Sequence, residues 1–205
     1  MELRPLEAVA TTPSEKMRSI GAVQDPAPIL RRVAAPFALP DEAEDARRGV
    51  AELHSALGRA SRLHHFAKGS GVAAPQLGIG RAAAVVRTPD GETITLLDPH
   101  VIEESADTDE QHEGCWSFFD VRGKVARSLG IHVAHQDVDG TPRITSFGEA
   151  VARLVAHEVD HLHGVLYVDR MPPGACTVRV GDYRATGLPG YRRTLAVLTP
   201  QPTRL

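Results

Sequence analysis

The chain has 205 residues, 42% of them hydrophobic, which is enough for one domain with a sizeable core. Its formal net charge of −3 does not indicate an electrostatic nucleic-acid binder, and no apolar run is long enough to span a bilayer. The first 20 residues lack the continuous hydrophobic stretch of a secretory signal. We therefore expect a cytoplasmic protein that binds neither DNA nor membrane, with its two cysteines, Cys115 and Cys176, as free thiols.

Three regions are predicted along the chain. Residues 1–20 are polar and are expected to form a weakly structured arm, and residues 21–170 to form the folded domain. Residues 171–205 are rich in proline and glycine and are interpreted as a loosely packed tail, with 195–198 as a docking segment.

The first half of the folded region predicts one long helix and two strands. Residues 41–62 begin with acidic side chains and end with basic ones, and their apolar residues recur at helical spacing. The glycine-rich stretch 69–78 is either a turn before a strand or a place where a substrate approaches the backbone closely. Strands are predicted at 82–87 and 93–98, with strand edge and loop at 102–111.

The second half predicts a hairpin that leads into a second helix. Strands are expected at 124–128, 131–135 and 141–146, with a tight turn at 137–141. The residues 146–149 are typical of a capping-box start, and Gly164 is a plausible helix stop. A short extended piece is expected at 165–169.

This second predicted helix carries His157-Glu158-x-x-His161. Residues four apart lie on one helical face, so the two imidazoles can bind one metal ion, with Glu158 close enough to accept a proton from water. Upstream, the segment Glu113-Gly114-Cys115 offers a thiolate as a third ligand, although a lone buried cysteine is the common alternative. Two imidazoles and a thiolate favour zinc on ligand chemistry alone.

Two other classes of function share this pattern. A zinc peptidase would need a third ligand downstream, but no histidine follows His163. A catalytically silent protein that binds metal or formyl peptides would not require Glu158 or Gln76. His163 points away from the face shared by His157 and His161, so it is not expected to be a ligand.

Three motifs stand in a fixed order, at 69–76 (Gly-x-Gly-Val-Ala-x-x-Gln), 113–117 (Glu-Gly-Cys-x-Ser) and 157–161 (His-Glu-x-x-His). Together with residues 25–37 they resemble the peptide deformylases over roughly residues 20–170. The resemblance implies an α+β fold, with antiparallel sheets packed around a central HExxH helix. It implies a metal-dependent hydrolase that removes the formyl group from N-formyl-methionyl peptides and releases formate.

The resemblance also implies roles for individual residues. The metal, typically Fe²⁺ with Ni²⁺, Co²⁺ or Zn²⁺ as alternatives, would be bound by three ligands: Cys115, His157 and His161. The catalytic groups would be Glu158 as general base and then acid, Gln76, the backbone N–H of Trp116, and Gly71. Substrate contacts would come from Gly71, Val72, Gly114 and Arg122. The expected partners are nascent formylated peptides at the ribosome exit region, and the expected state is a monomer.

The chain departs from the family pattern directly after the cysteine. Trp116 stands where the family has leucine, and Phe118-Phe119 stand where it has an aliphatic residue and proline. These changes suggest a divergent deformylase that acts on another N-formyl substrate or serves as an inhibitor-tolerant extra copy. Assignments stay open for Arg153, which could line the substrate pocket, and for Asp160, which could orient a neighbour.

Overall fold

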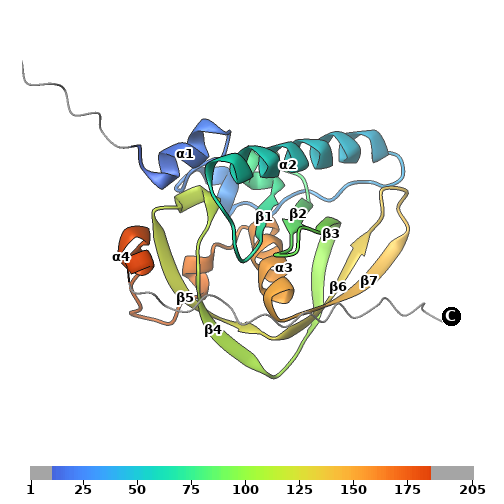
Figure 1. The fold of residues 1–205 in the computed structure, drawn as a ribbon. Helices are drawn as coiled ribbons and strands as arrows, with labels where there is room; N and C mark the ends of the chain where they lie inside the picture. Colours follow the sequence, from blue (N-terminus) through green and yellow to red (C-terminus); the bar gives the residue numbers. More distant parts are fainter. Residues whose placement is uncertain (1–10, 186–205) are drawn as a thin grey trace, which may run out of the picture.

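A computed structural model describes residues 11–185 of the chain (Figure 1). Two antiparallel sheets enclose a central helix, α3 (Glu149–Leu162), which confirms the expected α+β fold with the HExxH helix at its centre. The larger sheet has the strand order β1-β2-β3-β6-β7: Ser70–Ala73, Ala83–Arg87, Thr93–Glu104, Gly130–Gln136 and Pro142–Gly148. The smaller sheet has the order β4-β5-β8: Thr108–Glu113, Val121–Ser128 and Val178–Arg179.

Three further α-helices and four short 3-10 helices complete the described part of the chain. The α-helices are α1 (Pro13–Ser19), α2 (Ala43–Leu63) and α4 (Val180–Ala185), and the 3-10 helices are η1 (Pro28–Arg31), η2 (Ala74–Leu77), η3 (Trp116–Phe118) and η4 (Tyr167–Arg170). Within residues 11–185, no helix combines the length and the apolar character needed to cross a membrane.

Strands β1 and β2 are covered on both faces, by α2 on one side and α3 on the other. Val85 belongs to the core cluster of α2, whereas its neighbour Val86 packs with Val155 of α3. Side chains alternate between the faces of a strand, so a strand buried on both sides needs a continuous apolar run. The sequence Ala-Ala-Val-Val of β2 is such a run, and all four residues of β1 are buried as well.

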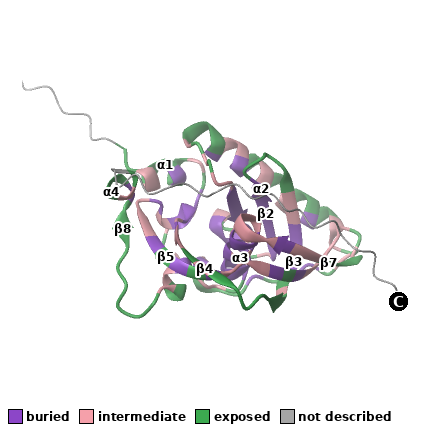
Figure 2. Cartoon of the chain, turned by 60° about the horizontal axis from the view of Figure 1, so that its bottom comes forward, coloured by how far each residue is buried: buried purple, intermediate pink, exposed green. Residues whose placement is uncertain are grey.

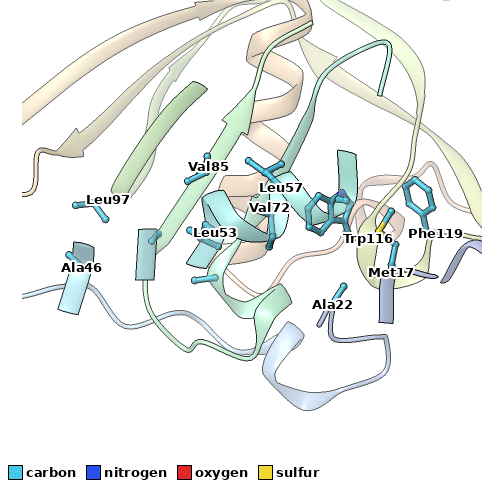
Figure 3. Close-up of a cluster of buried hydrophobic side chains, with 14 of the residues drawn as sticks. Met17, Ala22, Ala46, Leu53, Leu57, Val72, Val85, Leu97, Trp116 and Phe119 are labelled. Carbon is cyan, nitrogen blue, oxygen red and sulfur yellow. The ribbon is translucent and has the colours of Figure 1, made fainter. Parts of the chain in front are cut away.

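Helix α2 forms the outer layer over this sheet. Its buried residues recur at helical spacing, and Leu53 and Leu57 pack against Val72 and Val85 of the strands (Figure 3). The opposite face of α2 is exposed, and Figure 2 shows burial concentrated at α3 and β2. The predicted helix at 41–62 is thus confirmed, with its ends shifted by one or two residues.

The N-terminal region differs from the prediction of a weakly structured arm. Residues 13–19 form α1, which begins with a capping box between Thr12 and Glu15. Met17 is fully buried in the core cluster that contains Trp116 and Phe119 (Figure 3). The backbone N–H of Ser14 also donates to Asp120, 106 residues away. Tertiary packing, which local composition does not reveal, therefore orders this short helix.

Several element boundaries were also predicted wrongly. Strand β3 does not end at Asp98-Pro99 but continues to Glu104, with a register shift that absorbs the proline. Residues 167–170 form η4 instead of an extended piece, and residues 108–113 form a full strand. The predicted tail contains β8 and α4, and the docking segment predicted at 195–198 lies outside the described residues.

Helix α3 begins without the predicted capping box. Gly148 is the N-cap and offers no side chain, while the Ser146 hydroxyl lies 3.2 Å from a ring nitrogen of His132 within the sheet. The helix instead starts where β7 ends, and the N–H of Glu149 donates to the carbonyl of Leu129 at 2.6 Å. The predicted stop is confirmed: Gly164 has φ +71°, and a Cβ there would lie 2.7 Å from the backbone of Arg31.

Candidate active site

Two histidines of α3 and one cysteine converge in the interior. His157 and His161 lie one turn apart, with ring centroids separated by 5.0 Å, and Cys115 precedes η3. The Cys115 Sγ lies 3.2 Å from the His161 Nε2, and one ligand atom from each of the three residues lies within 4.8 Å of the others. Two imidazoles and a thiol at this spacing fit a divalent transition-metal ion and leave a coordination position free.

A buried carboxylate fixes the orientation of one of these histidines. The Nδ1 of His157 lies 2.9 Å from Oε2 of Glu113, which leaves Nε2 facing the centre of the cluster. Burial alone would raise the pKa of Glu113, but hydrogen bonds from His157 and Arg127 outweigh it and hold that pKa well below its usual range. Glu113 therefore stays ionised and orients the imidazole for metal binding.

Glu113 is part of a larger network of buried charges. Arg127 donates to both of its carboxylate oxygens at 2.9 and 3.0 Å, and Arg153 donates to it at 2.6 Å. Arg127 also donates to Asp160 at 2.6 Å, and Arg170 joins Asp160 from η4. The sequence left the roles of Arg153 and Asp160 open, named Glu113 as part of a motif without giving it a role, and did not single out Arg127. The available signals were the place of Glu113 in that motif and its position two residues before a candidate metal ligand.

Glu158 is fully enclosed next to the metal ligands. Burial raises its pKa to about 7, and the neighbouring His157 opposes that rise. Its Oε2 has no hydrogen-bond partner among residues 11–185. On its other side the carboxylate touches Gly71 of β1, where a Cβ would lie 2.3 Å from Oε1. Any larger residue at position 71 would therefore displace the Glu158 side chain, and the unpaired oxygen suits a proton acceptor.

Gln76 is held by two hydrogen bonds within the same site. Its Oε1 accepts from the N–H of Ala73 at 2.9 Å, which turns the Nε2 donor towards Cys115 Sγ at 3.3 Å. The amide N–H₂ group is thus aimed at the region around the metal ligands. Such a fixed donor can stabilise negative charge that develops on a reacting oxygen.

The large side chain of Trp116 does not fill the site. It is buried in the core cluster, and its Nε1 donates to the hydroxyl of Ser70 at 3.1 Å. Gly114 borders the guanidinium of Arg122 so closely that a Cβ would lie 2.5 Å from it. Val72, by contrast, turns its side chain into the core between the sheet and α2 and does not line the cavity.

A cavity of about 290 Å³ opens over these groups. Among the residues predicted for the site, it is lined by Gly71, Gln76, Gly114, Cys115, Trp116, Arg122, His157 and Glu158. The lining residues that the sequence did not assign to a site include His64, Phe66, Lys68, His112, Leu154, Tyr183 and Arg184. Neither His161 nor His163 is among the lining residues, but the His161 ring faces Cys115, whereas the His163 Nδ1 lies 2.9 Å from the backbone carbonyl of Val159.

A metal-binding HExxH helix, enclosed by antiparallel sheets and completed by a cysteine, places the protein in the class of mononuclear metallohydrolases. The chain belongs to the polypeptide deformylase family, whose family model matches residues 18–175. It is 38% identical over 111 residues to a peptide deformylase of Synechocystis sp., an alignment that covers 52% of this chain and 59% of the relative. It is 33% identical over 146 residues to the peptide deformylase of Thermotoga neapolitana, covering 71% of this chain and 83% of the relative.

Solved structures agree with the sequence comparison. A class I type b peptide deformylase from Acinetobacter baumannii, solved with Met-Ala-Ser bound, superposes with a TM-score of 0.63 at 29% identity. That match covers 73% of this chain and 96% of the other. The peptide deformylase of Thermotoga maritima superposes with a TM-score of 0.65 at 28% identity, covering 74% and 97%. The resemblance inferred from three motifs is therefore confirmed at the level of the family.

Proposed function

We propose that the protein removes the formyl group from N-formyl-methionyl peptides by hydrolysis and releases formate. The observation that carries the proposal is the cluster of Cys115, His157 and His161 beside Glu158 and Gln76, all of which except the more deeply buried His161 line one cavity. Family membership gives the chemistry of the substrate. A silent binding protein would not need Glu158 buried with one oxygen unpaired, because that arrangement is costly to maintain.

Each group has a distinct task in this proposal. When bound to Cys115, His157 and His161, a divalent ion supplies a Lewis acid. Glu158 accepts a proton from the attacking water and returns it to the nitrogen of the leaving amine as the C–N bond breaks. The Nε2 of Gln76 and the backbone N–H of Trp116 donate to the oxyanion, each contributing about 3–4 kcal/mol to transition-state stabilisation.

The substrate backbone is proposed to lie along β1. This strand is at the edge of the five-stranded sheet, so one side of it is open to an extended peptide. Ser70 and Gly71 of β1 line the cavity, and Val72 would contribute through its backbone only, because its side chain is in the core. Gly114 and Arg122 also line the cavity and complete the proposed substrate contacts.

We further propose Fe²⁺ as the native ion, with Ni²⁺, Co²⁺ and Zn²⁺ as alternatives. The ligand set alone would favour zinc, and the choice of iron rests on the family. The proposed setting is the cytoplasm, where a monomer meets nascent formylated chains near the ribosome exit.

The test is formate release from formyl-Met-Ala-Ser by protein prepared anaerobically with Fe²⁺ or Ni²⁺. The proposal predicts turnover by the wild type and none by Cys115→Ala, because a third ligand is lost. Cys176→Ala is the matched control, since Cys176 is exposed and lies outside the cavity. The absence of formate from the metal-loaded wild type would overturn the proposed function.

A further inference from the structure

The segment that follows the family match returns to the active-site cavity. The match ends at residue 175, and β8 then pairs with β5 in the register Val121↔Arg179 and Arg122↔Val178. The N–H of Val180 donates to the carbonyl of Asp120 at 2.8 Å, and α4 starts at that residue. In Figure 1, α4 lies beside β5. Strand pairing therefore anchors this segment next to Arg122.

Helix α4 contributes two side chains to the cavity rim, Tyr183 and Arg184. The ring of Tyr183 lies against His112 of β4, with centroids 5.0 Å apart. Arg184 is exposed. Burial is the main cause that lowers the pKa of His64, followed by the positive charges of Lys16 and Arg184. Burial also lowers the pKa of Arg122, and the charge of Arg184 adds to that effect. The segment thus contacts β4 through Tyr183 and adds two side chains to the lining of the cavity.

Arg122 has no carboxylate partner within ion-pair distance among residues 11–185. Its Nη1 donates to the carbonyls of Phe119 and Val121 at 2.9 and 2.8 Å, and its guanidinium lies 4.5 Å from the ring centroid of Phe119. Arg122 also lines the cavity. Guanidinium groups suit carboxylates because they donate two parallel hydrogen bonds.

The balance of charge at the cavity is cationic. Its lining includes Lys68, Arg122, Arg153 and Arg184 against two carboxylates, Glu113 and Glu158. Glu113 and Arg153 are already paired with each other, and Arg153 is also paired with Asp109, so Arg153 does not add to the net positive charge, whereas Arg122 and Arg184 do. The acidic residue of α4, Asp182, is exposed and does not line the cavity. A peptide that carries a carboxylate would therefore find complementary charge at this rim.

We propose that β8 and α4 form a specificity element in which Arg184, together with Arg122, selects formyl peptides that carry a carboxylate beyond the formylated residue. The proposal rests on the proposed function and names its substrate class. The carboxylate comes either from an acidic side chain or from the free C-terminus of a short peptide, and the two sources require separate probes.

The test uses the only tryptophan of the chain, Trp116, which lines the cavity and reports binding without turnover. Fluorescence titration of the metal-loaded protein gives Kd for three deformylated peptides: Met-Glu-Ser amide, Met-Gln-Ser amide and Met-Gln-Ser with a free C-terminus. We expect at least one carboxylate peptide to bind about threefold more tightly than the neutral amide, as for a partly exposed ion pair. The peptide that shows the preference identifies the source of the carboxylate.

Arg184→Gln should remove most of this preference, and Arg184→Glu should reverse it. The matched control is Arg179→Gln, because Arg179 is exposed on β8 but does not line the cavity, and it should keep the preference. Equal affinities for all three peptides in the wild type, or an unchanged preference in both Arg184 variants, would overturn the inference. Formate release from formyl-Met-Ala-Ser is measured in a separate assay. A protein that binds the carboxylate peptides more tightly but releases no formate would overturn the proposed function and leave the charge preference standing.

Discussion

The cavity has an inner wall, next to the proposed metal ligands, and an outer wall, formed by the rim residues Arg122 and Arg184. The two walls differ in whether their charged side chains are paired with opposite charges. The inner wall includes Glu113 and Arg153, and Arg127 and Asp160, which do not line the cavity, extend their network of ion pairs; each of the four residues is at most 8% exposed. On the outer wall, Arg122 lacks a carboxylate partner within the described range 11–185, and Arg184 is exposed. We propose that the inner wall keeps the metal ligands in one arrangement, whereas the charged groups of the outer wall bind the carboxylate of a peptide.

This contrast separates the requirements of chemistry from those of selectivity. Proton transfer and metal binding need groups fixed within fractions of an ångström, and buried, fully paired networks provide that rigidity. Recognition of variable peptides needs accessible groups whose replacement leaves the fold intact. Substitutions on the inner wall should therefore reduce turnover, metal binding or unfolding free energy more than substitutions farther from the proposed metal ligands. The following predictions test that ordering.

The largest effect is expected for Glu158→Gln. The amide cannot accept the proton of the attacking water, so formate release should fall on the order of a thousandfold. Metal content should stay at the wild-type level, because Glu158 is not one of the three clustered ligands. Formate assays paired with metal analysis check both parts. Substantial remaining activity would show that another group serves as the base.

Glu113→Gln should be the next most harmful change. It leaves Arg127 and Arg153 buried with less compensating charge, which costs about 3–5 kcal/mol of unfolding free energy, and it weakens metal binding by roughly 10–100-fold. Denaturant unfolding and metal titration measure the two effects. The matched control is Glu110→Gln on the same strand, whose exposed pair with Lys124 contributes at most about 1 kcal/mol. Equal losses of unfolding free energy in the two variants would contradict the distinction between buried and exposed ion pairs.

Gly71→Ala tests the close approach between β1 and Glu158. A Cβ would lie 2.3 Å from the carboxylate oxygen, so Glu158 must move, and a displacement of this size costs about 100-fold in turnover. Gly58→Ala is the control in α2, where a Cβ meets nothing within 4 Å and the helix should gain about 0.5–1 kcal/mol. Full activity in Gly71→Ala would show that Glu158 tolerates another position.

Trp116→Phe should have the smallest effect of the four. The change removes the hydrogen bond from Nε1 to Ser70, which contributes about 1 kcal/mol, but it keeps the backbone N–H proposed for the oxyanion. Thermal unfolding should therefore shift slightly while kcat changes little. A loss of kcat comparable to that of Gly71→Ala would mean that the indole itself positions the substrate.

The sequence predicts the parts of this site that depend on local spacing. His157, Glu158 and His161 share a helical face, and the family motifs identify Cys115 and Gln76 from their order along the chain. The charged network is different, because Glu113, Arg127 and Asp160 come from β4, β5 and α3 and meet only through the pairing of the two strands and the packing of the helix against them. Short elements such as α1 and α4 were missed for the same reason: long-range packing and pairing, with Met17 and Val180 buried, stabilise them.

The most direct test of the whole account is the metal content of ligand variants, because it requires no assumption about the substrate. Purified wild type, Cys115→Ala, His157→Ala, His161→Ala and His163→Ala are loaded anaerobically with Fe²⁺ or Ni²⁺ and analysed for bound ion. We predict one ion per chain in the wild type and in His163→Ala, and loss of the ion in the other three variants. Retention of the ion in Cys115→Ala, or its loss in His163→Ala, would contradict the proposed metal centre.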